Sequence, residues 1–132
     1  MLTSSRRWRG ALAVVVAVIS ISACSEGTSP IGQARKIIDD DHRFATSLEA
    51  GDALAHVGSI LLRAGKDCRE GCDALLSASA YAQVLAVRVL DCTAPGRFQV
   101  RTAMRHYLDD VEKARNRSAH AVPTPPDPPR CG

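Results

Sequence analysis

The chain has 132 residues, of which 45% are hydrophobic and 23% are charged, and this length and composition suit one globular domain. Its formal net charge is +3, from 17 basic and 14 acidic residues, but Arg6, Arg7 and Arg9 lie among the first 23 residues, which contain no acid. The rest of the chain is therefore balanced, with 14 basic and 14 acidic residues, and its charge gives no support to a nucleic-acid partner.

Residues 1–23 have the features of an export signal. The three arginines make a basic start, residues 11–21 form a short apolar run, and Ala23 is a small residue directly before Cys24. The apolar run is shorter than the ~20 residues that a stable membrane span needs. After export, the chain would lie in an oxidising compartment where its cysteines can form disulfides.

The end of this segment, Ile21-Ser22-Ala23-Cys24, resembles the lipobox of bacterial lipoproteins. The resemblance implies that Cys24 receives a diacylglycerol, becomes the new N-terminus and can be N-acylated. It also implies a location at the extracytoplasmic face of the cell membrane. The alternative is an ordinary secretory signal, with Cys24 an ordinary thiol. Arginine far outnumbers lysine, which is typical of G+C-rich genomes such as those of actinobacteria.

The sequence divides into four parts. Residues 1–23 are the signal, 24–32 the lipid-anchored tether and the start of the first helix, 33–118 the helical domain, and 119–132 an extended tail. The tether spans at most ~18 Å when extended, so we expect the domain to lie close to the membrane.

The first helix is expected to follow Ser29, whose hydroxyl can cap it, with Pro30 at the first helical position. Apolar residues recur at helical spacing from Ile37 to Leu48. Gly51 is expected to end this helix, because glycine favours helix C-termini.

Three further helices are expected. The second covers residues 53–64 and is stopped by Gly65. The third, residues 73–92, has apolar or small residues on nearly every face, which predicts a central helix covered by the others. Residues 93–96, Thr-Ala-Pro-Gly, are expected to form a turn. The fourth helix, residues 97–114, has the most regular amphipathic pattern.

No alternating pattern typical of strands competes with these helices. The predicted fold is all-α, a small up-and-down four-helix bundle. Residues 121–131 contain five prolines and should be extended, near polyproline II. Because this tail ends in Cys-Gly, we expect a disulfide to pin it to the bundle.

Besides Cys24, the exported chain has four cysteines, which suggests two disulfides. A helix over residues 73–91 would be ~28 Å long, whereas the Cα atoms of a disulfide lie within ~7 Å of each other. Cys72 therefore cannot reach Cys92, and Cys68 is too close to Cys72 to reach it either. The predicted pairs are Cys68 with Cys72 and Cys92 with Cys131.

Two alternatives to this pairing stay open. Cys131 could pair with Cys68 or Cys72, which would leave Cys92 as a free thiol. Cys68 and Cys72 could instead contribute to a zinc site, although no well-spaced histidine pair accompanies them.

Two carboxylate and imidazole pairs are candidates for metal binding. Asp39 precedes His42 by three residues, and His106 precedes Asp109 by three. Di-iron bundles use similar spacing but take glutamates from all four helices, and neither pair here has one. Tyr107 is a further candidate ligand for haem. No cofactor other than the lipid at Cys24 is predicted, and solvated polar faces are the alternative.

Arg97, Arg101 and Arg105 form a stripe in the first half of the fourth helix, where positive charge opposes the helix dipole. An acidic group should therefore lie opposite. The internal candidate is the run of aspartates at residues 39–41, and the external candidate is an anionic envelope partner. The alternative is a stripe that is simply solvated.

No nucleophile motif, phosphate-binding loop or dinucleotide fingerprint is present in the sequence. The predicted function is a non-enzymatic binding or structural module of the cell envelope, anchored in the membrane and contacting an envelope protein or polymer. The alternative is a metal- or haem-binding envelope protein that uses His42 and His106.

Overall fold

The computed structural model describes residues 29–131, so the predicted signal, the lipobox and Cys24 lie outside the described residues. Within the described range the chain is helical and has no strand. Its four α-helices and two short 3-10 helices are α2 (Pro30–Ile38), η1 (Asp41–Phe44), α3 (Ser47–Asp67), α4 (Cys72–Arg88), η2 (Val89–Asp91) and α5 (Ala94–Arg117). The predicted up-and-down four-helix bundle is confirmed.

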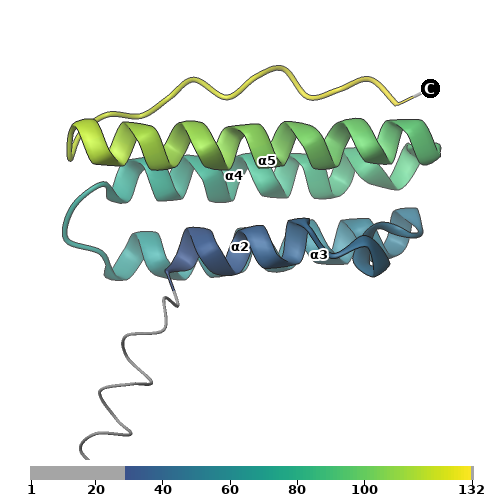
Figure 1. Ribbon diagram of the computed structural model, residues 1–132, viewed down its shortest axis with the longest axis horizontal. Coiled ribbons are helices and arrows are strands. Elements are labelled where there is room, and N and C mark those ends of the chain that lie inside the picture. Colours follow the sequence, from purple (N-terminus) through teal and green to yellow (C-terminus); the bar gives the residue numbers. More distant parts are fainter. Residues whose placement is uncertain (1–28, 132) are drawn as a thin grey trace, which may run out of the picture.

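The four helices run side by side in two layers (Figure 1). One layer holds α2 and α3, and the other holds α4 and α5. Helix α2 packs against α3 and α5, and α4 also packs against α3 and α5, so that α2 and α4 occupy opposite corners of the bundle. The core is a continuous apolar cluster drawn from all four helices, and its largest fully buried side chains include Tyr107, Leu54, Leu75 and Met104.

The first helix is much shorter than predicted. It ends at Ile38, and a new helix begins at Ser47, so the prediction that it continues to Gly51 was wrong. Two side chains account for the break. The Asp40 carboxylate accepts a hydrogen bond from the backbone N–H of His42 and caps η1. Thr46 Oγ1 accepts one from the backbone N–H of Glu49 and caps α3.

Gly51 and Gly65 lie inside α3, so the expected helix stops at both positions were also wrong. Together with Gly58 they recur every seven residues on the face that packs against α4. A Cβ atom added at Gly51, Gly58 or Gly65 would lie 3.3 to 3.4 Å from a backbone carbonyl oxygen of α4. The Ser79 hydroxyl donates to the Gly58 carbonyl oxygen over 2.7 Å. The glycines therefore allow two helix backbones to approach closely.

The starts of α4 and α5 are shaped by a glycine and a proline. Gly71 precedes α4 with φ of 71°, a left-handed conformation that glycine adopts without steric cost. This bend lets Cys68 pair with Cys72. Helix α5 begins at Ala94, so residues 94–96 belong to the helix and not to the expected turn. Pro95 fits there because the first turn of a helix does not need its N–H.

The tail, residues 119–131, has no regular secondary structure and runs back along α5 for the length of the bundle (Figure 1). It is held at three places. The Gly71 N–H donates to the Ala119 carbonyl oxygen, the Tyr107 hydroxyl donates to the Pro123 carbonyl oxygen, and Cys131 is bonded to Cys92. Both predicted disulfides and the pinned tail are confirmed.

Candidate functional site

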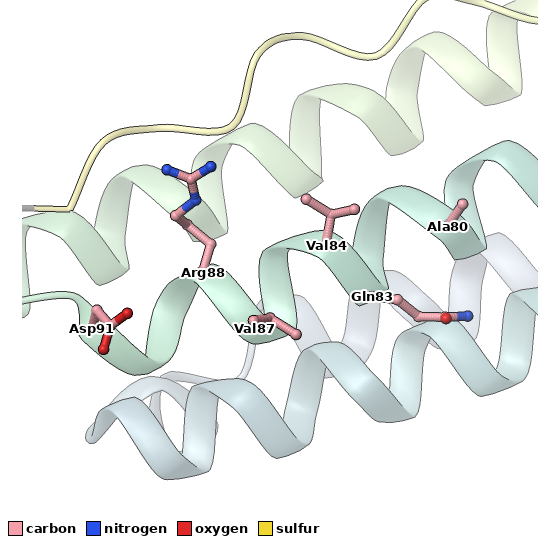
Figure 2. A pocket seen from close by; sticks show the side chains of 6 residues that line it. All are labelled: Ala80, Gln83, Val84, Val87, Arg88 and Asp91. Atoms are coloured by element: carbon pink, nitrogen blue, oxygen red, sulfur yellow. The ribbon is translucent and has the colours of Figure 1, made fainter.

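Helix α4 exposes an apolar stripe to solvent, which corrects the expectation of a central helix that the other helices cover. Val84 is 49% exposed and Val87 70%, and Leu90 of the adjoining η2 is 49% exposed. A shallow groove of about 640 Å³ follows this stripe, and Figure 2 shows the residues that line it: Ala80, Gln83, Val84, Val87, Arg88 and Asp91.

The position of α4 in the bundle explains the exposure. Leu75, Ala78 and Leu85 are buried in the core. Tyr81 is also buried and packs edge-on against Tyr107 of α5. Helices α3 and α5 pack against two sides of α4, and Val84 and Val87 lie on a side that stays exposed. By length and composition alone Cys72–Asp91 would also suit a membrane span, but its buried residues make it a core helix here.

Two opposite charges lie at one end of the groove. Arg88 and Asp91 are three residues apart, both are exposed, and no ion pair joins either of them to another side chain in the described range. The groove therefore combines exposed aliphatic side chains with one unpaired positive and one unpaired negative group. Such a surface suits another protein better than a small polar substrate.

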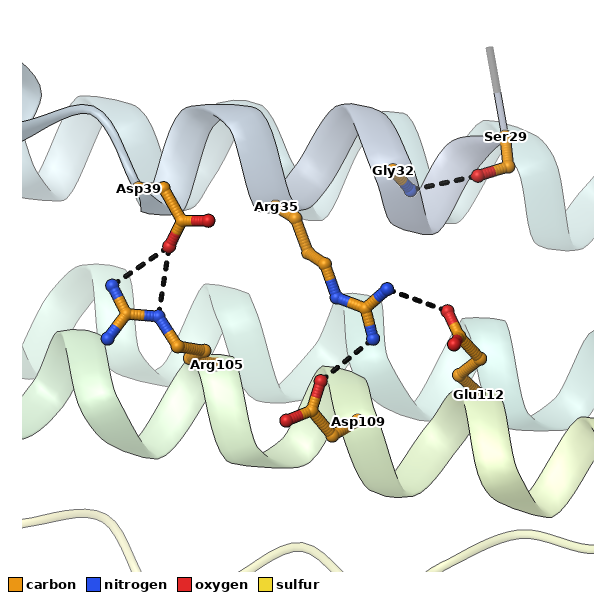
Figure 3. Close-up of polar contacts among 7 residues, drawn as sticks. All are labelled: Ser29, Gly32, Arg35, Asp39, Arg105, Asp109 and Glu112. Carbon is orange, nitrogen blue, oxygen red and sulfur yellow. Dashed lines mark hydrogen bonds and ion pairs between the residues drawn. The ribbon is translucent and has the colours of Figure 1, made fainter. Parts of the chain in front are cut away.

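The interface between α2 and α5 is polar and closed by ion pairs (Figure 3). The Arg35 guanidinium donates to Asp109 over 2.8 Å and to Glu112 over 2.7 Å. Arg105 donates to Asp39 over 2.9 Å. Two of the candidate metal ligands, Asp39 and Asp109, are thus each engaged by an arginine of a neighbouring helix.

The arginine stripe of α5 holds the connection between α2 and α3. Arg97 donates to the Ala45 carbonyl oxygen and the Ser47 hydroxyl. Arg101 donates to the carbonyl oxygen of Ile38 and to the Asp41 carboxylate. The internal candidate, the aspartate run, is therefore the partner that Arg101 and Arg105 contact.

Arg101 also changes the chemistry of its acidic partner and covers an aromatic ring. Its hydrogen bond to Asp41, helped by its charge, lowers the pKa of that carboxyl below 3.8. Its guanidinium lies 5.1 Å from the centre of the Phe44 ring, within range of a cation–π contact. The stripe thus stabilises the segment in which the predicted first helix is interrupted.

The histidines proposed as ligands are exposed, His42 on η1 and His106 on α5. Nowhere in residues 29–131 do three or more His, Cys, Asp or Glu side chains gather as a metal site would require. Tyr107, the candidate haem ligand, is fully buried, and its hydroxyl is hydrogen-bonded to Ser77 and Pro123. Metal binding and haem binding both stay predictions.

Comparison with protein-family models, curated proteins and solved structures found no match to this chain. The candidate site therefore rests on geometry alone.

Sequence reasoning missed the α4 groove, although a signal for it was present. A helix that is apolar on nearly every face needs cover on every side, and in a four-helix bundle a corner helix has only two adjacent helices.

Proposed function

We propose that this protein is a membrane-anchored extracytoplasmic lipoprotein that acts as a non-enzymatic binding module of the cell envelope. The observation that carries the binding role is the exposed apolar stripe of α4, because soluble domains seldom leave several neighbouring aliphatic side chains uncovered without a partner. The lipobox-like Ile21-Ser22-Ala23-Cys24 supports the anchor.

The place where the domain starts supports a position close to the bilayer. Helix α2 begins at the end of the bundle where α3 stops and α4 starts (Figure 1). The same end carries basic residues suited to anionic lipid headgroups, interspersed with the acids Asp67, Glu70, Asp73 and Glu112: Arg63, Lys66, Arg69, Lys113, Arg115 and Arg117. With a short tether, this end would face the membrane, and the charged end of the α4 groove would lie at the far end of the bundle.

The contacts of the polar side chains support a non-enzymatic role. The Ser77 hydroxyl bonds the Tyr107 hydroxyl, and the Ser79 hydroxyl bonds a backbone carbonyl oxygen. Arg35, Arg101 and Arg105 are engaged in ion pairs across α2, η1 and α5. These groups have structural partners, whereas Arg88 and Asp91 of the α4 groove form no ion pair within residues 29–131.

The anchor is tested by fractionating cells that express the full chain with and without Cys24→Ser. The unchanged chain should enter the membrane fraction and incorporate an alkyne-labelled fatty acid. Cys24→Ser should abolish the label and release the protein. Equal labelling of both forms would show that Cys24 is not the acylated residue.

The binding role is tested by placing a photo-crosslinking amino acid at Val87 in the groove or at exposed His56 on α3. We expect a discrete crosslinked product from position 87 and none from position 56. No product from either position would contradict the role of the groove. Elemental analysis of the untagged protein tests the alternative, because stoichiometric iron, copper or zinc would favour a metal-binding function.

A further inference from the structure

The proline-rich tail is attached to the bundle near both of its ends and is exposed between these attachments. Two hydrogen bonds and a disulfide hold it, at Ala119, Pro123 and Cys131. Every residue from 124 to 127 is exposed, whereas Pro123 and residues 128–129 are half-buried. Within residues 29–131, no hydrogen bond or ion pair involves residues 124–130. The middle of the tail therefore presents polar groups that have no partner in this part of the chain.

Proline determines the backbone geometry of this stretch. The ring fixes φ of each proline at about −65°, and the residue before a proline is confined to extended conformations. These restraints give residues 124–128 the geometry of a polyproline II helix, which rises about 3.1 Å per residue and has three residues per turn. Because proline has no N–H, the stretch offers another molecule mainly ring surfaces, carbonyl oxygens and a few polar side chains.

The exposed residues of this stretch form a surface that we call the proline face: Thr124, Pro125, Pro126, Asp127 and Arg130. We propose that the proline face docks into a groove of a second protein, and that this groove is lined with aromatic side chains and bordered by an acidic group. Such grooves bind polyproline II segments because aromatic rings pack on proline rings while their N–H or O–H groups donate to the exposed carbonyl oxygens. The proline face shares no residue with the α4 groove, so it is a second interaction site, beyond the binding role proposed above.

Two exposed charges give the proline face a direction. Asp127 and Arg130 are three residues apart, so they lie on the same edge of a polyproline II helix and about 9 Å from each other along its axis. Neither forms an ion pair within the described part of the chain. Prolines alone distinguish the two directions of such a helix poorly, whereas complementary charges fix the register of an interface. We therefore expect an acidic group of the partner opposite Arg130 and a hydrogen-bond donor opposite Asp127.

The attachments of the tail keep the proline face in the extended form that a groove would bind. The bond from Cys131 to Cys92 holds one end, and the hydrogen bond from Tyr107 to Pro123 holds the other. A free chain loses conformational entropy when it binds, whereas this segment has already lost much of it on folding. A contact that is only about 19 Å long, from residue 124 to residue 130, can therefore suffice.

A lipid bilayer and a second copy of this chain are less suitable partners. Residues 124–130 contain no Trp, Phe or Leu that could enter a bilayer, and one acid and one base give no net attraction to anionic headgroups. A second copy would have to supply an aromatic-lined groove, and no aromatic residue lines the α4 groove. A different protein with aromatic side chains and an acidic border satisfies both requirements.

The first experiment identifies what the proline face contacts in intact cells of the native host. A photo-crosslinking amino acid replaces Thr124 of the full chain, and the same amino acid at exposed Asp110 on α5 is the control. We expect one discrete protein product from position 124 and none from position 110, with the attachment site beside a Trp, Tyr or Phe of the product, as located by mass spectrometry. No product from position 124, the same product from both positions, attachment only to lipid or glycan, or attachment remote from any aromatic residue would overturn the proposal.

The second experiment measures the affinity of the crosslinked protein, once purified, for the chain from residue 24 with Cys24→Ser. Pro125→Ala and Arg130→Glu should each weaken binding about fivefold or more, as the loss of a central interface residue does. The matched controls are Pro129→Ala, which removes a half-buried ring outside the proline face, and Arg117→Glu, which makes the same charge change at an exposed position of α5. Both controls should bind within about twofold of the unchanged chain. Equal losses in test and control variants would contradict the proposal.

Two further variants separate the proline face from the tail's attachment and from the α4 groove. Replacing both Cys92 and Cys131 by serine should weaken binding about threefold or more, because the tail must then be ordered by the partner. Unchanged affinity would show that binding needs no preformed segment. Val87→Arg alters only the α4 groove and should leave the affinity unchanged. If Val87→Arg abolishes binding while Pro125→Ala does not, the partner occupies the α4 groove, and the docking role of the tail is wrong while the groove's binding role stands.

Discussion

The Tyr107 hydroxyl donates a hydrogen bond of 2.7 Å to the carbonyl oxygen of Pro123, which joins helix α5 to the middle of the tail. The same hydroxyl lies 2.7 Å from the Ser77 hydroxyl of α4, which is free to donate to it. Three segments of the chain are thus joined at one buried oxygen, and the tail is positioned by polar contact as well as by its disulfide.

Tyr107→Phe should destabilise the protein by about 1–2 kcal/mol, because it leaves the Pro123 carbonyl and the Ser77 hydroxyl without this partner. Tyr81→Phe is the matched control. The Tyr81 hydroxyl is buried and has no hydrogen-bond partner among the described residues, so its removal should be neutral or slightly stabilising. Urea denaturation of both variants measures the difference, and equal losses would contradict it.

Stability should fall as the pH rises above 10. Burial raises the pKa of both Tyr107 and Tyr81 above their ordinary value of 10.0. The unfolded chain then releases these protons at a lower pH than the folded chain, so the folded state is favoured below pH 10 and loses that advantage above it. Tyrosinate absorbance at high pH should appear together with the loss of helical circular dichroism. Ionisation of both tyrosines near pH 10 in a folded protein would contradict this.

Gly58→Leu should destabilise the bundle by about 2 kcal/mol, since a side chain there meets the Gln83 side chain and the Ser79 carbonyl oxygen of α4. The gain in helix propensity offsets only part of this cost. Ser59→Leu, at the next and exposed position, changes the same helix without this contact and should shift stability by no more than about 0.5 kcal/mol. Thermal unfolding compares them, and similar melting temperatures would argue against close packing of α3 on α4.

The two disulfides should contribute unequally. Cys92 and Cys131 are 39 residues apart in sequence, and the loop-closure model predicts a loss of about 4 kcal/mol when both are replaced by serine. Cys68 and Cys72 are 4 residues apart, and the same model predicts about 2 kcal/mol. Urea denaturation of the two double variants measures which of them loses more free energy of unfolding. Limited proteolysis should cut within the tail only when Cys92 and Cys131 are replaced.

Arg101→Met should raise the pKa of Asp41, because the hydrogen bond from Arg101 is the main cause of its lowered value. A carboxylate whose pKa is lower in the folded chain stabilises the fold at pH values above its pKa in the unfolded chain. This contribution is lost as the pH falls through its pKa in the folded chain. Asp41 is largely exposed, so the change in stability should be small while the shift in pKa remains measurable by NMR titration. An unchanged Asp41 titration in Arg101→Met would contradict the assigned cause.

Long-range constraints in this sequence were more informative than local ones. The length of the third helix excludes a bond between Cys72 and Cys92, and this reasoning predicts both disulfides correctly. The proline-rich tail is extended as its composition requires. These inferences succeed because chain length and proline geometry do not depend on neighbouring segments.

Local signals failed where tertiary packing overrides them. Glycine ends many helices, but a glycine every seven residues lies on one helix face, and here that face meets α4. Apolar residues near Ile37 and Leu48 keep a helical spacing, yet Leu48 is 74% exposed and the chain turns between them. Asp40 and Thr46 are typical N-cap residues and interrupt the helix here, although the apolar spacing continues across them.

The bond from Cys92 to Cys131 also determines how the domain would carry a mechanical load. A force applied between residue 29 and Cys131 passes through α2, α3 and α4 and then crosses the bond directly. Residues 93–130, with all of α5, are shielded from tension and keep about 130 Å of chain from extending. A reducing agent would add that length to the extension measured when a single molecule is pulled.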